Sequence, residues 1–246
     1  MARLFALADL HLSLTGHKPM DVFGELWRDH VSRMARAWDR TVAPDDTVLL
    51  AGDLSWGRNL TEAEPDLAWI GDRPGRKLLL RGNHDSWWRS QKKVREALPP
   101  RCDLLQNDAF RIGPWVVVGS RGWLAPDDPA ATKSDAAVYR RELGRLRTSV
   151  AFADREFGRD APRLAVTHYP PRLDSGEATP VVELLARSGV SAVVYGHLHG
   201  DDHAIAIRGL RDGIHYYFVA ADAVGFSPVE IVSPVGRSAN ADGQLD

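Results

Sequence analysis

Cysteine is almost absent from this chain of 246 residues, and Cys102 is its single example. One thiol excludes an intramolecular disulfide, and it also excludes a zinc site built from several cysteine ligands. Because the chain needs no oxidation to fold, we expect a cytoplasmic protein.

Long apolar runs are absent as well. No stretch approaches the roughly 18 uninterrupted apolar residues of a membrane-spanning helix, so the sequence predicts no membrane partner. Residues 1–7 are largely apolar, but they are followed almost at once by Asp9 and His11. They lack the basic region, longer apolar core and cleavage site of a secretion signal, which again favours the cytoplasm.

The chain has no surplus of charge of either sign. Its 31 Lys and Arg residues stand against 33 Asp and Glu residues, which gives a formal net charge of −2. A nearly neutral net charge gives no evidence of nucleic-acid binding, although a protein with such a net charge can still have a local basic groove. The composition supports no nucleic-acid partner and leaves protein partners unknown.

What the chain does have is enough apolar material for a core. Hydrophobic residues make up 44% of the sequence, and the length fits one α/β domain at the upper end of its usual size. We find no internal repeat and no linker. We therefore expect a single domain over residues 1–235, followed by a polar, disordered tail over residues 236–246.

Short apolar runs alternate with longer amphipathic segments. Runs rich in Val, Leu and Ile predict buried strands at residues 4–8, 47–51, 77–80, 115–119, 164–167 and 192–195. Apolar residues at helical spacing predict helices at residues 21–40, 62–70, 91–98, 135–156 and 180–187, with Asp21 as the first N-cap. This alternation is typical of βαβ units. Residues 203–208, 214–220 and 229–232 lack intervening helices and predict antiparallel strands of a second sheet.

Residue types that bind metals follow five of the predicted strands, at the point where each strand ends. The motifs are Asp9-Leu10-His11, Gly52-Asp53, Gly82-Asn83-His84-Asp85, His168 and Gly196-His197-Leu198-His199. Ligands of open α/β sheets bind outside the carboxyl ends of the strands, so we expect these side chains to meet at one edge of one sheet. Asp9 and His11 should point to the same side of an extended segment. The three glycines indicate sharp turns and a close approach of the backbone to a ligand.

Together the motifs supply more ligands than one ion accepts. The candidates are Asp9, His11, Asp53, Asn83, His168, His197 and His199. Imidazole, carboxylate and amide groups without thiolate suit Mn²⁺, Fe or Zn²⁺. Two such divalent ions, roughly 3.5–4 Å apart and sharing a carboxylate, accommodate the whole set and activate a bridging water for attack on phosphorus. Each motif alone has a simpler interpretation as a turn, but their joint occurrence favours the metal site.

The motifs and their order resemble those of the calcineurin-like metallophosphoesterase superfamily, over residues 9–199. The resemblance implies an α/β fold that is a four-layer α/β/β/α sandwich, with two mixed sheets flanked by helices. It implies a first metal held by Asp9, His11, Asp53 and His199. It implies a second metal held by the bridging Asp53 with Asn83, His168 and His197. It makes His84 a catalytic group that contacts phosphate and protonates the leaving oxygen, with Asp85 as its structural or orienting neighbour.

The sequence departs from the motifs of two branches of this superfamily, and each departure argues against membership of that branch. Protein Ser/Thr phosphatases carry Gly-Asp-x-x-Asp-Arg-Gly where residues 52–58 read GDLSWGR, which lacks the second Asp. Relatives that hydrolyse a lipid A precursor tend to have Arg in place of His84. The tryptophan-rich surroundings are similar to a poorly characterised bacterial branch of predicted phosphohydrolases, which leaves the substrate open.

Several residues beside the motifs are candidates for substrate binding. The tryptophans that follow a metal motif or lie in a long loop are Trp56, Trp87, Trp88 and Trp123. They predict cleft walls that stack on a flat substrate group, with packing beneath loops as the alternative. Arg121 and Arg172 are candidate phosphate clamps. His203 fits a solvated turn or the rim of the site.

The sequence therefore predicts a metal-dependent phosphatase or phosphodiesterase that hydrolyses a small phosphomonoester or phosphodiester through a metal-bridging hydroxide. A nuclease of the same fold is one alternative, but it needs a basic groove. A catalytically silent scaffold that binds protein partners is the other. Such scaffolds lose ligands, whereas this chain keeps all seven candidates together with His84.

Overall fold

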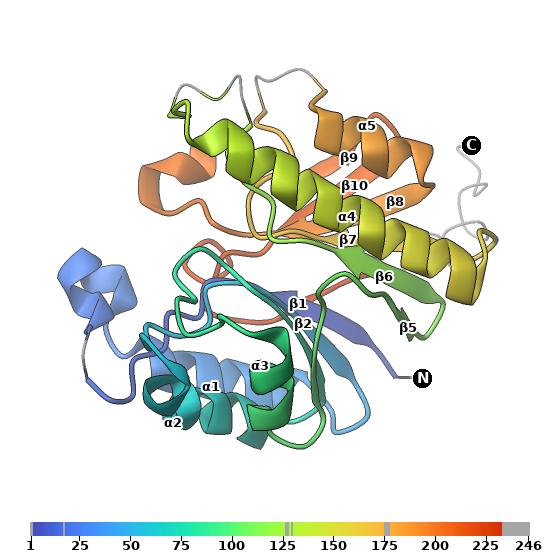
Figure 1. Cartoon of the computed structure of the whole chain (residues 1–246). Helices are drawn as coiled ribbons and strands as arrows, with labels where there is room; N and C mark the ends of the chain where they lie inside the picture. The colour runs from blue at the N-terminus through green and yellow to red at the C-terminus, as the bar shows by residue number, and fades with distance from the viewer. Residues whose placement is uncertain (1, 17, 126–127, 129, 175–177, 233–246) are drawn as a thin grey trace, which may run out of the picture.

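A computed structural model describes the chain except for residues 1, 17, 126–127, 129, 175–177 and 233–246. Two mixed sheets pack face to face, with helices on the outer side of each (Figure 1). This confirms the predicted four-layer α/β architecture. The predicted tail, residues 236–246, lies outside the described residues. No described helix combines the length and the apolar character needed to cross a bilayer.

The first sheet has five strands in the order β11-β1-β2-β3-β4. Four of them are parallel, namely β1 (Leu4–Leu7), β2 (Thr47–Ala51), β3 (Arg76–Leu80) and β4 (Cys102–Leu104). The edge strand β11 (Val229–Glu230) pairs antiparallel with β1. Helices α1 (His30–Thr41), α2 (Leu60–Asp72) and α3 (Gln91–Ala97) cover its outer face (Figure 1).

The second sheet has six strands in the order β5-β6-β7-β8-β10-β9. Its parallel centre consists of β6 (Trp115–Gly119), β7 (Arg163–Val166), β8 (Val190–Tyr195) and β10 (Ile214–Phe218). Strands β5 (Phe110–Ile112) and β9 (Gly209–Arg211) pair antiparallel at its two edges. Helices α4 (Asp135–Phe157) and α5 (Pro180–Arg187) lie on its outer face (Figure 1).

The apolar runs of the central strands are buried on both faces. In β1, Phe5 and Leu7 pack in the cluster beneath the outer helices, whereas Leu4 and Ala6 pack against the second sheet. Because successive residues of a strand point to opposite faces, both sets must be apolar. This explains why β1 shows no alternation of polar and apolar residues.

The predicted first helix is interrupted. Short 3₁₀ helices occupy Met20–Phe23 and Glu25–Trp27, and α1 begins only at His30. Gly24 (φ 125°) and Asp29 (φ 52°) have backbone angles that an α-helix does not allow. Asp21 is therefore not the N-cap of α1, and the prediction for this segment was wrong at its N-terminal half.

The C-terminal strands also differ from expectation. Residues 203–208 form no strand, because a 3₁₀ helix spans Gly200–Ile205. Strand β10 pairs parallel with β8, and β11 joins the first sheet. The predicted set of antiparallel strands therefore reduces to the pairing of β10 with the short β9 and of β11 with β1. These pairings depend on contacts between distant segments, which local patterns do not report.

Candidate metal centre

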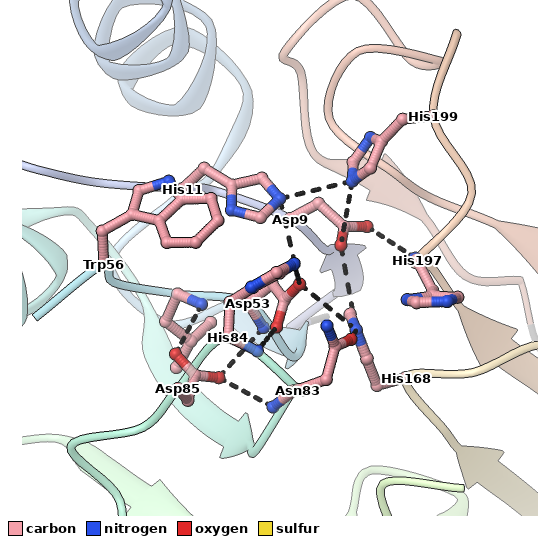
Figure 2. Close-up of polar contacts among 12 residues, drawn as sticks. Asp9, His11, Asp53, Trp56, Asn83, His84, Asp85, His168, His197 and His199 are labelled. Atoms are coloured by element: carbon pink, nitrogen blue, oxygen red, sulfur yellow. Dashed lines mark hydrogen bonds and ion pairs between the residues drawn. The ribbon is translucent and has the colours of Figure 1, made fainter. Parts of the chain in front are cut away.

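The five motifs come together where the two sheets meet. Asp9, Asp53 and Asn83 follow β1, β2 and β3 of the first sheet, whereas His168 and His197 follow β7 and β8 of the second (Figures 1 and 2). The expectation of one edge of one sheet was therefore wrong, and the site lies at the junction of two. Main-chain hydrogen bonds cross that junction: Ala8 N donates to Val219 O at 2.9 Å, and Ala221 N donates to Ala8 O at 3.0 Å.

Four of the candidate ligands have a left-handed backbone. The φ angles are 59° at Asp9, 46° at His11, 53° at Asp53 and 76° at His197. Asp9 and His11 are thus not in an extended segment, although both side chains reach the same group of atoms. Such conformations cost about 1–3 kcal/mol each and persist only where the surroundings hold them. Here Asp9 N donates to Gly52 O and His11 N to Asp53 O, which links the first motif to the second.

Two glycines leave the room that the carboxylates occupy. A Cβ atom at Gly82 would lie 2.1 Å from Asp53 Oδ1, and one at Gly196 would lie 2.2 Å from Asp9 Oδ2. Any larger residue at these positions would displace a candidate ligand. The backbone at these two glycines therefore lies close to the carboxylates of Asp53 and Asp9.

Asp9, His11 and His199 form the first candidate ligand group. The Nε2 atoms of His11 and His199 lie 3.3 Å apart, and His199 Nε2 lies 3.7 Å from Asp9 Oδ1 (Figure 2). Asp9 is fully buried, and within the described part of the chain its Oδ1 has no hydrogen-bond partner. A buried carboxylate oxygen without a donor is costly. A divalent cation between these three side chains would satisfy it, so the residues present fit such an ion.

Asp9, Asp53 and His168 form the second candidate ligand group, and Asn83 lies beside His168. His168 Nδ1 lies 3.0 Å from Ala51 O and donates to it, because a carbonyl oxygen only accepts. The other ring nitrogen, Nε2, faces Asn83 Oδ1 at 2.7 Å and Asp53 Oδ2 at 3.4 Å (Figure 2). One imidazole nitrogen between two oxygens is a donor set that a divalent ion would suit.

Electrostatics in the centre reflect this crowding of carboxylates and imidazoles. Burial raises the pKa of Asp9 to about 7. Burial alone would lower the pKa of His168, but the Asp53 carboxylate outweighs it and raises the pKa to about 9. Burial lowers the pKa of His11 to about 3. In the metal-free centre, His168 thus carries a proton beside a carboxylate, and a metal ion at its Nε2 would have to displace that proton, whereas His11 stays neutral and keeps a lone pair for a metal.

His197 stands somewhat apart from the other ligands. Its backbone N donates to Asp9 Oδ2 at 2.9 Å, while its ring packs 3.9 Å from the Tyr169 ring and 5.0 Å from that of His168. No ligand group found among the described residues contains the His197 side chain. Its role as a ligand stays a prediction, whereas its backbone clearly fixes Asp9.

His84 lies on the open side of the centre. Its side chain is 44% exposed, and its Nε2 is 3.9 Å from Asp53 Oδ2 (Figure 2). Its backbone N donates to Asp53 Oδ1 at 2.8 Å. Partial burial lowers the pKa of this imidazole below its usual value. The ring is therefore near the candidate ligands and open to a substrate.

Asp85 has the opposite environment, because it is fully buried. Its carboxylate accepts five N–H groups, from the backbones of Asp53, Leu54, Ser55 and Gly82 and from the indole of Trp87. These donors belong to the two loops that follow β2 and β3. Asp85 therefore ties together the two loops that carry Asp53 and Asn83, and its carboxylate is buried away from the surface.

Two of the four candidate tryptophans are core residues. Trp87 is 2% exposed and Trp88 is 1% exposed, and both belong to the cluster beneath the outer helices of the first sheet. Their indole N–H groups donate to Asp85 and Gln106. The prediction that these two rings wall a cleft was wrong, because the chain after His84 turns directly into the core.

Trp56 does lie against the site. Its ring stacks on that of His11, with centroids 5.0 Å apart, and lies 4.4 Å from that of His84 (Figure 2). The Lys18 ammonium, which sequence reasoning missed, lies 3.4 Å from the centre of the Trp56 ring. Among the described residues, Lys18 forms no ion pair with a carboxylate.

The remaining substrate candidates are engaged elsewhere. The Trp123 ring packs on Tyr169 and its Nε1 donates to Asp135 at 2.7 Å. Arg121 pairs with the buried Glu142 at 3.2 Å. Arg172 pairs with Asp212 at 2.8 Å. Both guanidinium groups already have carboxylate partners, which argues against the predicted phosphate clamps.

Asp222 is a further residue that sequence reasoning missed. It accepts from His199 Nδ1 and from His203 Nε2, each at 3.0 Å. His203 thus lies at the rim of the site rather than in a solvated turn. The available signal was a carboxylate shortly after the apolar run 214–220, which is the same pattern that marks the five motifs.

Two stacked sheets gather carboxylates and imidazoles at their strand ends, and this donor set suits divalent metal ions. The chain matches the calcineurin-like phosphoesterases over residues 2–201, and it belongs to that family. This confirms the resemblance drawn from the motifs. Members of this family are described as phosphoesterases, and the candidate ligand groups of this chain suit divalent metal ions.

Two phage proteins match part of the chain. The Gene 66 proteins of Mycobacterium phages L5 and D29 are 42% and 39% identical over 88 residues. Each match covers 35% of this chain and 41% of the phage protein, so the chain spans well under half of these relatives.

Solved structures match over nearly the whole chain. Phosphopantetheinyl Hydrolase (PptH) from Mycobacterium tuberculosis has a TM-score of 0.57 and 15% identity, over 95% of this chain and 97% of that one. AQ665 from Aquifex aeolicus, described as a protein of unknown function, has a TM-score of 0.50 and 15% identity, over 94% and 96%. At this identity the two structures show a shared fold alone.

Proposed function

We propose that the protein is a dinuclear-metal-dependent phosphoesterase that hydrolyses a small phosphomonoester or phosphodiester. The observation that supports this best is the buried Asp9 Oδ1, which accepts no hydrogen bond from the described residues and lies 3.7 Å from His199 Nε2 and 3.8 Å from His168 Nδ1. When bound, two divalent ions, Mn²⁺, Fe or Zn²⁺, would supply hydroxide near neutral pH and neutralise charge on the phosphate.

In this proposal Asp53 is the carboxylate shared by the two ions. Its Oδ2 lies 3.9 Å from His11 Nε2 and 3.4 Å from His168 Nε2, so one oxygen faces both ligand groups. Asp9, His11 and His199 would complete the first site. Asn83, His168 and His197 would complete the second. A shared carboxylate also explains why seven ligands suffice for two ions.

His84 would bind the phosphate and protonate the leaving oxygen. It is exposed, it faces Asp53 from the open side, and no ligand group among the described residues contains it. Burial lowers its pKa, which makes the protonated ring a stronger proton donor. Trp56 and Lys18 would form the adjacent rim, where an ammonium that pairs with no described carboxylate is available to an anionic ester.

A metal-dependent activity screen tests the proposal. Purified protein with Mn²⁺ should hydrolyse p-nitrophenyl phosphate or bis-p-nitrophenyl phosphate, and chelation should abolish the turnover. The screen should include cyclic nucleotides, single-stranded DNA and, because of the fold shared with PptH, a phosphopantetheinyl ester. Turnover of DNA alone would favour the nuclease alternative. Two bound metals without turnover of any ester would favour the silent scaffold and overturn the proposal.

We also propose a cytoplasmic location, which the lone Cys102 and the absence of any possible internal disulfide support. Fractionation of cells that produce the full chain tests this. Recovery of the protein with secreted or membrane fractions would contradict it.

A further inference from the structure

We propose that Asp222 is a positioning residue for the metal centre, which holds His199 with its Nε2 directed at Asp9 and His11, and that His203 anchors Asp222 in turn. The inference rests on the proposed function, because it assigns His199 to the first metal. It adds two residues that neither the motifs nor the family match contains, since the match ends at residue 201.

The position of Asp222 is fixed by the main chain beside the first motif. Ala221 N donates to Ala8 O at 3.0 Å, so Asp222 and Asp9 directly follow two residues that are hydrogen bonded to each other. The Asp222 side chain is 1% exposed. A carboxylate so deeply buried needs partners for both oxygens, and the structure provides them.

Each oxygen of Asp222 has its own donors. Oδ1 lies 3.0 Å from His199 Nδ1, while Oδ2 lies 3.0 Å from His203 Nε2 and 3.3 Å from Gly200 N. The donors come from the 3₁₀ helix Gly200–Ile205 and the residue before it, so one carboxylate ties this segment to the end of β10. Contacts on both oxygens prevent the carboxylate from rotating.

The tautomer of His199 follows from this contact. A carboxylate accepts, so the proton of the neutral ring resides on Nδ1 and the lone pair remains on Nε2. That nitrogen lies 3.3 Å from His11 Nε2 and 3.7 Å from Asp9 Oδ1. A carboxylate behind a metal-binding histidine fixes the ring and raises its basicity, and losing it typically weakens metal binding by 10–100-fold.

His203 contacts Asp222 and is therefore one residue further from the candidate metal site than Asp222 is. Its ring packs edge-on against Phe218 at 5.6 Å, and its side chain is 24% exposed. It touches Asp222 but belongs to no group with Asp9 or Asp53 among the described residues. Removing it should loosen Asp222 without removing the contact with His199, and its effect should therefore be the smaller one.

Metal-binding measurements on the full, metal-free chain test the proposal without relying on turnover. Titration calorimetry with Mn²⁺ should give two sites for the wild type. Asp222→Ala should weaken one site by roughly 10–100-fold and leave the other within about twofold. His203→Gln, which keeps a donor for Asp222, should weaken it less than His203→Ala. The matched control is Asp202→Asn, which removes a charge from an exposed residue of the same 3₁₀ helix and should change neither site.

A spectroscopic measurement separates positioning from a general loss of negative charge. In the Zn²⁺-loaded wild type, proton NMR should show a slowly exchanging imidazole N–H from His199 Nδ1. The signal should disappear or exchange rapidly in Asp222→Ala, and it should persist in Asp202→Asn. Should Asp222→Ala fail to fold, the isosteric Asp222→Asn provides the same measurements.

Three results would overturn the inference. Unchanged Mn²⁺ affinity in both Asp222 variants would show that His199 needs no support. Loss of a whole ion at saturating Mn²⁺ would show that Asp222 is itself a ligand. A third ion in the wild type, absent from His203→Ala, would show that His199, His203 and Asp222 form a separate cation site. A wild type that binds fewer than two ions would instead refute the proposed function.

Discussion

Replacing Asp85 by asparagine tests whether this residue holds the metal-binding loops or takes part in the chemistry. One of its oxygens accepts the backbone N–H groups of Asp53 and Gly82, and the other accepts three further N–H groups. Asparagine has nearly the same shape but keeps only one oxygen. In the orientation that keeps the three hydrogen bonds, the asparagine side chain therefore turns its NH₂ group toward the buried backbone N–H groups of Asp53 and Gly82.

The structure sets the size of the effect. A buried donor without an acceptor costs about 1–3 kcal/mol, so two of them should lower the free energy of unfolding by about 2–6 kcal/mol. Asp85 is 0% exposed, which leaves little opportunity for water to replace the lost acceptor. The loops that carry Asp53 and Asn83 would lose their shared anchor, and the affinity for Mn²⁺ should fall as well.

Urea unfolding of the metal-free protein measures this directly. Asp45→Asn is the matched control, since Asp45 is exposed and its substitution should stay within about 0.5 kcal/mol of the wild type. An Asp85→Asn variant as stable as the control would show that the carboxylate does not hold the two loops. A stable Asp85→Asn that binds two ions but has lost turnover would make Asp85 a catalytic residue.

Three further predictions concern the candidate centre itself. Metal-replete protein should contain close to two transition-metal ions per chain by elemental analysis, because seven candidate ligands exceed what one ion accepts; one ion or fewer would contradict it. Asp53→Asn should reduce metal content and turnover more than Asp9→Asn, because Asp53 Oδ2 faces both His11 and His168. Retention of two ions and normal turnover by Asp53→Asn would refute the bridge. His84→Ala should keep both ions and lower kcat by roughly 10²–10⁴ for an alkyl ester, and by less for p-nitrophenyl phosphate, whose leaving group needs little protonation. An equal loss on both esters would mean that His84 only binds the phosphate, and loss of an ion would make it a ligand.

The strands and motifs could be predicted from sequence because their signal is local. Strands such as β2 are buried on both faces, so an uninterrupted apolar run is required wherever they occur. The polar residue after each run then marks the carboxyl end of a strand. The local pattern could not predict that these strand ends meet at the junction of two sheets. Their meeting depends on pairings between distant residues, such as that of Ala8 with Ala220.

Side-chain orientation was the weaker part of the prediction. Trp87 and Trp88 directly follow a metal motif, yet a turn immediately after His84 directs both rings into the core. Asp9 and His11 reach the same group through left-handed backbone rather than strand alternation. The sequence did not predict a role for Asp222, because its hydrogen-bond partner His199 is 23 residues away in the chain. Each case depends on a single backbone angle or a distant contact, which the sequence pattern does not encode.

The junction of the two sheets has a thermodynamic consequence. Asp9, His11, Asp53 and Asn83 belong to one sheet, and His168, His197 and His199 belong to the other. Any ion held by members of both sets acts as a cross-link between two halves that otherwise share an apolar interface and a few main-chain bonds. A metal ion that binds only the folded protein stabilises it by about 4 kcal/mol when the free metal concentration is 1,000 times the dissociation constant. Cellular metal supply would then govern the lifetime of the folded chain as well as its activity.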